Sequence, residues 1–175
     1  MPGDIVVRES RSDDAAALEK LYPEAFPNED LLPVVRALLS EGPAVLSLVA
    51  TAGQTLVGHV AFTTCSVEGS SQRYAMLAPL AVTPGRQRQG IGSALVREGL
   101  RRLEAGGTAQ VHVLGDPAYY GRFGFTADED VAPPYPLPPE WKGAWQVLRL
   151  RDDAPPARGT LTVPPLWRQP ALWAP

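Results

Sequence analysis

Hydrophobic positions change their spacing several times along the chain, and each change predicts an element. Apolar residues alternate or run together, as in strands, over 5–8, 44–51, 55–67, 76–83, 109–115 and 145–150. Spacings of three and four, typical of helices with one apolar face, occur over 15–21, 30–40 and 91–103. Because helical and strand patterns are interleaved, we expect an α/β fold.

Turn and capping residues mark where these elements begin and end. Ser12, Asp13 and Asp14 offer caps for the first helix, and Gly42-Pro43 ends the second. Ala52-Gly53-Gln54 between two strand patterns predicts a hairpin, and Gly106-Gly107 closes the third helix. Asp116-Pro117 predicts an N-cap followed by proline at the first helical position.

Length and composition favour one domain. A chain of 175 residues buries roughly two-thirds of its unfolded surface, enough for one core. We expect the domain to span 1–150 and a Pro- and Trp-rich extension, 151–175, to pack on it. Asp152–Pro175 holds six of the 19 Pro and two of the four Trp, which is too apolar for a free linker.

Charge and cysteine content exclude several classes of protein. A net charge of -3 gives no general attraction to nucleic acid or anionic membranes, so any anion site must be local. The start, MPGDIVVRES, lacks an apolar signal region, and no stretch is long enough to span a bilayer. One cysteine forms no internal disulfide, and two histidines provide no zinc cluster. We therefore expect a cytoplasmic protein without a metal.

A glycine-rich turn, PGRQRQGIGSAL, links a strand pattern to a helical one at residues 84–95. It has the glycine spacing of a P-loop, but Ile91 and Gly92 stand where a Lys and a Ser or Thr are needed. A dinucleotide fingerprint would begin at Gly90, but Leu95 takes its third glycine position. A nucleotide hydrolase is excluded, and a dinucleotide dehydrogenase is disfavoured.

The remaining interpretation of this turn is a backbone anion site. Gly90 and Gly92 carry no Cβ, so consecutive N–H groups can converge on a ligand beside the positive end of a helix. Such a nest suits a pyrophosphate, and Arg86 and Arg88 add charge. A glycine-rich turn with solvated arginines is the alternative.

Two motifs together resemble a known family. QRQGIG matches the (Q/R)xxGx(G/A) signature of the GCN5-related N-acetyltransferases, and PAYYGRFGF resembles their tyrosine segment, with Tyr120, Gly124 and Phe125 in place. The resemblance covers residues 4 to 130 and extends to one bacterial subgroup, the YhbS-like acetyltransferases. It implies the acyl-CoA N-acyltransferase fold, in which helices flank a mixed, mostly antiparallel sheet.

The resemblance also implies an activity: direct transfer of an acetyl group from acetyl-CoA to a primary amine in a ternary complex. Tyr120 would protonate the departing thiolate, and the backbone N–H of Val82 would bind the thioester oxygen. Pro79, which removes a ladder donor, fits a strand opened to admit the acetyl donor, although it would equally fit a simple edge strand. The implied cofactor-binding residues are Leu80, Ala81, Val82, Gln87, Arg88, Gln89, Gly90, Ile91, Gly92, Ser93, Tyr119 and Phe123.

No general base is evident, since residues 76–82 contain neither acid nor histidine. Glu24, Glu29 and Asp30 lie in the region that forms the acceptor side in relatives, so each is a candidate for binding or deprotonating an amine; each would otherwise be a surface charge. The acceptor would be a small-molecule amine or a peptide N-terminus. We expect no nucleic-acid or membrane partner, and a monomer or homodimer.

Other residues favour structural interpretations. His59 and His112 fall inside strand patterns, where a hydrogen-bonded core histidine is expected, and Cys65 is expected to be half-buried and unreactive. Val113 and Asp116 replace the Asn and Ala of the wider family, which puts the cofactor contacts of that Asn in doubt. A non-catalytic acyl-CoA sensor or an interaction domain is the alternative function.

Overall fold

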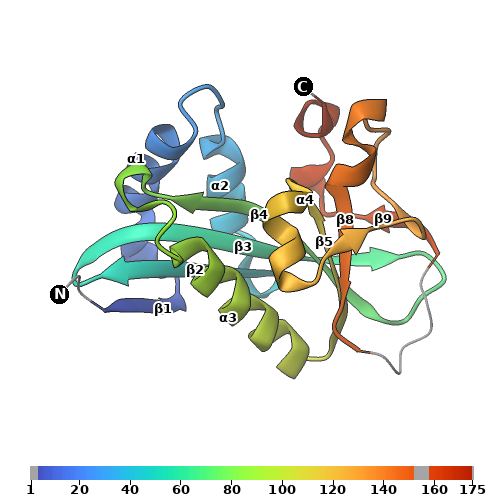
Figure 1. The fold of residues 1–175 in the computed structure, drawn as a ribbon, viewed down its shortest axis with the longest axis horizontal. Coiled ribbons are helices and arrows are strands. Elements are labelled where there is room, and N and C mark those ends of the chain that lie inside the picture. Colours follow the sequence, from blue (N-terminus) through green and yellow to red (C-terminus); the bar gives the residue numbers. More distant parts are fainter. Residues whose placement is uncertain (1–3, 152–157, 175) are drawn as a thin grey trace. The chain divides into compact units, whose positions relative to one another are not determined.

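The computed structural model describes residues 4–151 and 158–174, which fall into two compact units. The first contains residues 4–62 and 78–102, and the second contains the other described residues. The expected α/β class is confirmed, because helices flank a mixed and mostly antiparallel sheet (Figure 1). The division into a domain over 1–150 and an extension stays a prediction.

The first unit is built on strands in the order β1-β2-β3-β4. β1 pairs antiparallel with β2 from Ile5↔Ala52 to Glu9↔Leu48. The strands are β1 (Ile5–Glu9), β2 (Val45–Ala52), the first part of β3 (Thr55–Val67) and the last part of β4 (Arg73–Val82). The helices are α1 (Ala15–Ala25), α2 (Leu32–Leu39) and most of α3 (Ile91–Ala105).

Alternation along β3 sends neighbouring side chains to helices on opposite faces. His59 meets Tyr22 of α1, whereas Gly58 and Phe62 face α3. Gly99 of α3 lies so close to Phe62 that a Cβ there would be 2.1 Å from a ring carbon. The α1–α2 side is filled by the buried cluster Leu18, Leu21, Tyr22, Val35, Val49 and Ala81. Both faces of the strands are therefore covered.

Within the second unit, the strands follow the order β4-β5-β8-β6, with β4 contributing its first part. β5 (Thr108–Leu114) runs parallel to β4 over Arg73–Met76 and antiparallel to β8 (Trp145–Arg149), which pairs with β6 (Thr126–Ala127). β9 (Gly159–Thr162) pairs with the end of β3 and with β7 (Val131–Ala132). α4 (Pro117–Tyr120) follows β5. Short 3-10 helices span Ser12–Asp14, Gly42–Ala44, Pro84–Arg86, Gly121–Phe123, Pro139–Ala144, Pro165–Trp167 and Pro170–Trp173.

The C-terminal tryptophans are buried in the second unit. Trp167 donates from its indole N–H to Thr63 Oγ1 at 3.1 Å, and Trp173 donates to the Trp167 carbonyl at 3.0 Å. The Trp173 ring meets Trp145 of β8 edge to face, with centroids 5.8 Å apart. Both indole N–H groups are thus satisfied where they are buried, as burial of a polar group requires.

Most elements lie where the hydrophobic pattern predicts them, but Asp14 takes part in the capping box of the 3-10 turn Ser12–Asp14 and is not the N-cap of α1. Asp14 makes no side-chain cap to α1. Its carboxylate instead accepts two hydrogen bonds from the Arg8 guanidinium, at 2.8 and 2.9 Å, and one from the Arg11 N–H at 2.7 Å. A bidentate ion pair outweighs a single cap bond, so Asp14 ties β1 to the start of α1.

Candidate active site

The turn between β4 and α3 is folded back by its own side chains. Gln87 donates from Nε2 to the Val82 carbonyl at 3.2 Å, and Gln89 donates to the Gly85 carbonyl at 3.4 Å. Arg88 and Gly90 take the left-handed backbone conformation, with φ of 64° and 84°. Glycine adopts this conformation without strain, whereas Arg88 is an unusual residue for it.

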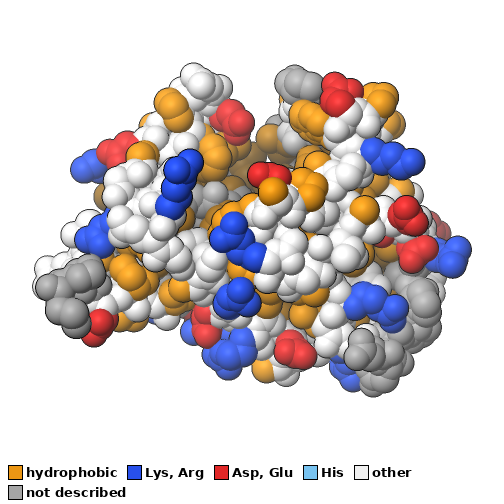
Figure 2. Space-filling view, in the orientation of Figure 1, with side chains coloured by type: hydrophobic (Ala, Val, Ile, Leu, Met, Phe, Trp, Pro, Cys, Tyr) orange, Lys and Arg blue, Asp and Glu red, His pale blue; other side chains and the backbone are white. Residues whose placement is uncertain are grey.

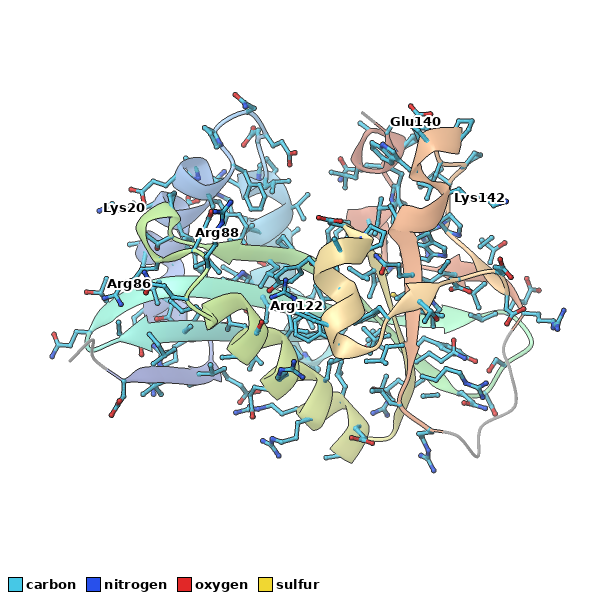
Figure 3. All side chains as sticks on the ribbon, viewed as in Figure 1. Lys20, Arg86, Arg88, Arg122, Glu140 and Lys142 are labelled. Atoms are coloured by element: carbon cyan, nitrogen blue, oxygen red, sulfur yellow. The ribbon has the colours of Figure 1, made fainter. Side chains whose placement is uncertain are left out.

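The turn leaves a run of backbone donors without partners. The first helical bond of α3 runs from the Ala94 N–H to the Gly90 carbonyl at 3.0 Å. Within the described part of the chain, no group accepts from the backbone N–H of residues 88–93. These donors lie at the positive end of a 15-residue helix, and Arg86 and Arg88 project from the same turn (Figure 3). The arrangement is chemically an anion site.

Close packing fixes the start of α3 on the sheet. A Cβ on Gly58 would lie 2.9 Å from Leu95 Cδ1 and 3.2 Å from both Ile91 Cγ2 and the Ala81 carbonyl oxygen. The Thr83 N–H donates to the Val57 carbonyl at 2.9 Å, which anchors the end of β4 on β3. In the space-filling view, basic side chains lie on the surface of this unit over the turn and α3 (Figure 2). The amides of the turn are therefore held on a rigid base.

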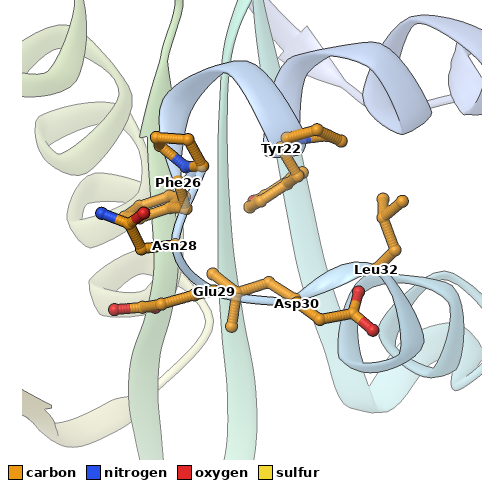
Figure 4. Close-up of a pocket in the computed structure, with 9 residues that line it drawn as sticks. Tyr22, Phe26, Asn28, Glu29, Asp30 and Leu32 are labelled. Atoms are coloured by element: carbon orange, nitrogen blue, oxygen red, sulfur yellow. The ribbon is translucent and has the colours of Figure 1, made fainter.

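A pocket of about 350 Å³ lies between the end of α1 and the start of α2 (Figure 4). Glu29 and Asp30 line it, and their carboxylates point in different directions in the close-up. The exposed Glu24 is not among the lining residues. The complete lining is Tyr22, Pro23, Phe26, Pro27, Asn28, Glu29, Asp30, Leu31 and Leu32. Two exposed carboxylates beside apolar side chains suit a cation that carries an apolar group.

A chain of hydrogen bonds leads from this pocket into the sheet. The Tyr22 hydroxyl is 2.5 Å from His59 Nδ1. His59 Nε2 is 2.8 Å from Ser47 Oγ, which is 2.8 Å from Ser10 Oγ. Tyr22 and His59 are buried, whereas Ser47 and Ser10 are half-buried. Burial lowers the pKa of His59 to about 4, so its imidazole is neutral at neutral pH. Burial also raises the pKa of the Tyr22 phenol.

The tyrosine segment begins as the sequence predicts. Asp116 caps α4 by accepting from the Ala118 N–H at 2.9 Å, so its capping role is confirmed. Tyr120 packs edge to face on Phe125, with centroids 5.8 Å apart, and a Cβ on Gly115 would lie 2.4 Å from its ring. No described residue is a hydrogen-bond partner of the Tyr120 hydroxyl. Burial raises its pKa, so the phenol keeps its proton at neutral pH.

Neighbouring aromatic residues hold this segment together. The Tyr119 ring meets Tyr120 at 5.0 Å and Phe123 at 5.6 Å, in both cases edge to face. The Arg122 guanidinium stacks 4.3 Å over the Tyr119 ring and donates to the Tyr119 carbonyl at 2.8 Å. Gly124 then takes the left-handed conformation that ends the short helix, with φ of 100°.

The remaining candidate residues are structural. His112 is fully buried and pairs through Nδ1 with Asp128 at 2.9 Å, which confirms its place in the core. Cys65 is more buried than expected, and burial raises the pKa of its thiol to about 12. Within the described ranges, three or more metal-ligating side chains nowhere gather at one point, and no helix is long and apolar enough to cross a membrane.

The mixed sheet and the turn before α3 are those of the acyl-CoA N-acyltransferase fold. Comparison with protein families agrees: residues 15–125 match the acetyltransferase (GNAT) family model, and the chain belongs to that family. The resemblance stated from the two motifs, and the fold that it implies, are confirmed.

The chain is similar to the uncharacterized N-acetyltransferase YhbS of Escherichia coli K12. The two are 39% identical over 145 residues, which cover 81% of this chain and 84% of YhbS. A crystal structure of YhbS in complex with CoA matches with a TM-score of 0.85 and 33% identity, covering 94% of this chain and 92% of that one. A Brucella melitensis GNAT acetyltransferase in complex with acetyl-CoA matches with a TM-score of 0.75 and 30% identity, covering 94% and 98%.

Sequence reasoning missed the partners of His59. It placed this histidine in a strand core but did not connect it to Tyr22 and Ser47, which are 37 and 12 residues away. The available signal was a single polar residue inside an apolar stretch of each of two strands, Ser47 in VLSLVA and His59 in LVGHVAF. Buried polar side chains need partners, so two such positions in adjacent strands indicate a shared network.

Proposed function

We propose that this protein is an acetyl-CoA-dependent N-acetyltransferase that transfers the acetyl group to a primary amine by direct attack in a ternary complex. The observation that carries the proposal is the run of partnerless backbone N–H groups over residues 88–93 at the start of α3. Several aligned donors at a helix N-terminus favour a doubly charged anion such as the pyrophosphate of CoA. The CoA and acetyl-CoA complexes of the two similar proteins support this choice.

The acetyl donor is bound, in this proposal, along the end of β4 and over the turn. Backbone groups of Leu80, Ala81 and Val82 hold the pantetheine arm, and the Val82 N–H binds the thioester oxygen. The parallel register of β4 with β5 ends at Met76, before this segment. The pyrophosphate contacts come from Gln87, Arg88, Gln89, Gly90, Ile91, Gly92 and Ser93, while Tyr119 and Phe123 contact the arm of the donor.

Tyr120 is the proposed general acid that protonates the departing thiolate. Its raised pKa keeps the phenol protonated, and its hydroxyl has no partner among the described residues that would hold the proton elsewhere. A Tyr120→Phe variant should lower turnover about 100- to 10,000-fold while acetyl-CoA affinity stays the same. Rates measured by thiol release, with affinity measured by calorimetry, test this. Unchanged turnover would remove Tyr120 from the mechanism.

The acceptor is proposed to bind in the pocket between α1 and α2. Glu29 and Asp30 there attract an ammonium group, and Phe26, Leu31 and Leu32 contact its apolar part. A small-molecule amine or a peptide N-terminus fits this chemistry. We further propose a cytoplasmic location, and a monomer or homodimer that needs neither a metal nor nucleic acid.

Two measurements decide between an enzyme and a sensor. Calorimetry with CoA and with acetyl-CoA tests the turn, and thiol release from acetyl-CoA tests turnover on a panel containing phenethylamine, n-butylamine, spermidine and an alanyl peptide. Binding with turnover supports the proposal. Binding without turnover on any amine indicates a non-catalytic acyl-CoA sensor, and absence of binding overturns both.

A further inference from the structure

Acetyl transfer from a thioester to an amine requires a proton to leave the acceptor, because an ammonium group has no lone pair with which to attack. Residues 76–82 of β4 contain no acid and no histidine. The carboxylates of Glu29 and Asp30 are exposed at the pocket. The chain Tyr22–His59–Ser47–Ser10 forms a polar path that begins at the pocket and runs through the core.

Its position in the sheet brings this chain close to the proposed thioester site. The Thr83 N–H donates to the Val57 carbonyl, so counting two residues along each strand places His59 across from Ala81. Ala81 and Tyr22 belong to the same buried cluster on the α1–α2 side. Tyr22 also lines the pocket. An amine that reaches the end of β4 on this side therefore arrives beside Tyr22.

On the basis of the function proposed above, we propose that Tyr22, His59, Ser47 and Ser10 form a relay that carries the acceptor's proton from the pocket to the surface. Every member can both donate and accept a hydrogen bond. In the outward orientation, each hydrogen bond of the chain is donated toward the surface: Tyr22 donates to His59 Nδ1, His59 Nε2–H donates to Ser47, and Ser47 donates to Ser10. Ser10 and Ser47 are half-buried, so the far end is open to water.

The proton balance of the relay closes. One ammonium N–H bond breaks as its proton moves to Tyr22 Oη, and the phenol proton moves to His59 Nδ1. The Nε2 proton moves to Ser47 Oγ, the Ser47 proton moves to Ser10, and Ser10 releases one proton to water. The amine keeps the electron pair with which it attacks. The chain is then in its inward orientation, and rotation of the hydroxyls and return of the imidazole tautomer restore it.

The surroundings of His59 suit an imidazole that passes protons on but does not itself carry a permanent positive charge. Burial keeps its imidazole neutral, and Asp14, paired with Arg8, exerts the opposite and weaker effect on its pKa. Tyr22 is the titratable group in direct contact with it from α1. A neutral imidazole with a hydroxyl on each nitrogen can accept a proton on one side while it releases one on the other.

Ser47→Ala tests the relay, because it interrupts the chain and leaves the Tyr22–His59 bond intact. With the panel amine that the wild-type enzyme acetylates fastest as acceptor, kcat/KM at pH 7 should fall at least tenfold, and the deficit should shrink as the pH approaches that at which the free amine loses its proton. The KM for acetyl-CoA should not change. Tyr22→Phe should give the same pH profile, and Ser47→Thr, which restores a hydroxyl, should recover activity at pH 7 relative to Ser47→Ala.

Ser40→Ala is the matched control, since the Ser40 hydroxyl bonds to the Arg36 carbonyl on an exposed surface outside the relay. Where Ser47→Ala does not fold, Ser10→Ala interrupts the half-buried end instead. A Ser47→Ala enzyme with the wild-type pH profile overturns the relay and leaves the acetyltransferase proposal standing. A wild-type protein that binds no CoA, or acetylates no amine of the panel, overturns the proposed function and the relay with it.

Discussion

Gly90→Ala separates the anion-binding role of the turn from its role in folding. Gly90 has φ of 84°, and a Cβ built on it meets no protein atom within 4 Å. The substitution therefore adds no crowding inside the protein, and its cost is that of a left-handed alanine, roughly 1–2 kcal/mol. For a chain of this size, such a loss lowers Tm by about 2–8 °C.

Gly53→Ala is the matched control. Gly53 lies in the hairpin between β2 and β3, has φ of 62°, and also has open space around its built Cβ. Both variants should lose similar stability, but only Gly90→Ala changes the backbone that presents the partnerless amides. Each hydrogen bond to a charged group is worth about 1.5–3 kcal/mol, so losing one weakens CoA binding about 10- to 100-fold.

Titration calorimetry with CoA, together with thermal unfolding of the free variants, measures both effects. We expect the Gly53→Ala protein to bind CoA as the wild type does and the Gly90→Ala protein to bind at least tenfold more weakly. Equal affinity of all three proteins would refute the assignment of pyrophosphate to this turn. Equal weakening of both variants would attribute the loss to lowered stability and not to the amides.

Three further predictions concern stability and reactivity. Gly99→Ala should destabilise the protein by about 1–2 kcal/mol in urea unfolding, because overpacking against Phe62 exceeds the gain of about 1 kcal/mol in helix propensity; Phe62→Leu in the same background should recover the loss. Hydrogen bonding to Arg8 lowers the pKa of Asp14. The Arg8–Asp14 pair therefore stabilises the folded protein above pH 3.8, the ordinary pKa of the carboxyl, and this stabilisation is lost as the pH falls through the lower pKa that Asp14 has in the folded protein. The deficit of Asp14→Asn, about 1–3 kcal/mol at pH 7, should therefore vanish in acid. Cys65, whose thiol pKa is raised to about 12 by burial, should react with a disulfide reagent at pH 8 only after unfolding, and rapid labelling of the native protein would contradict its burial.

Sequence patterns predicted the helices and strands whose conformation depends mainly on their own residues. The apolar spacing predicted α3 and the alternation predicted β3, because both periods follow from the geometry of the element itself. β9 was missed, since its four residues gain their conformation from pairing with β3, Ser66↔Thr162. The cap expected at Asp14 failed for a similar reason, because the Arg8 partner belongs to the preceding strand.

Sequence patterns likewise predicted only part of the candidate site. The turn and the tyrosine segment are continuous motifs, so their residue types and spacing were enough to locate them. The relay is assembled from β2, β3, α1 and Ser10, which follows β1, and no spacing along the chain encodes it. The pocket residues Glu29 and Asp30 were found because of their region in relatives, whereas Tyr22 and Phe26 at the same pocket looked like ordinary helix-core residues.

The two buried histidines show why proton transfer is assigned to one of them. His59 has an oxygen partner on each ring nitrogen, and both partners are hydroxyls, which can pass a proton in either direction. His112 has the carboxylate of Asp128 on Nδ1, while its buried Nε2 has no partner among the described residues. A proton that entered His112 from Asp128 at Nδ1 would find no acceptor at Nε2 in the described part of the chain. Asp128 also accepts from the N–H groups of Asp130 and Val131, so this pair anchors a loop. Burial alone therefore does not distinguish a carrier from an anchor; the chemistry of both ring partners does, and only His59 has a path on each side.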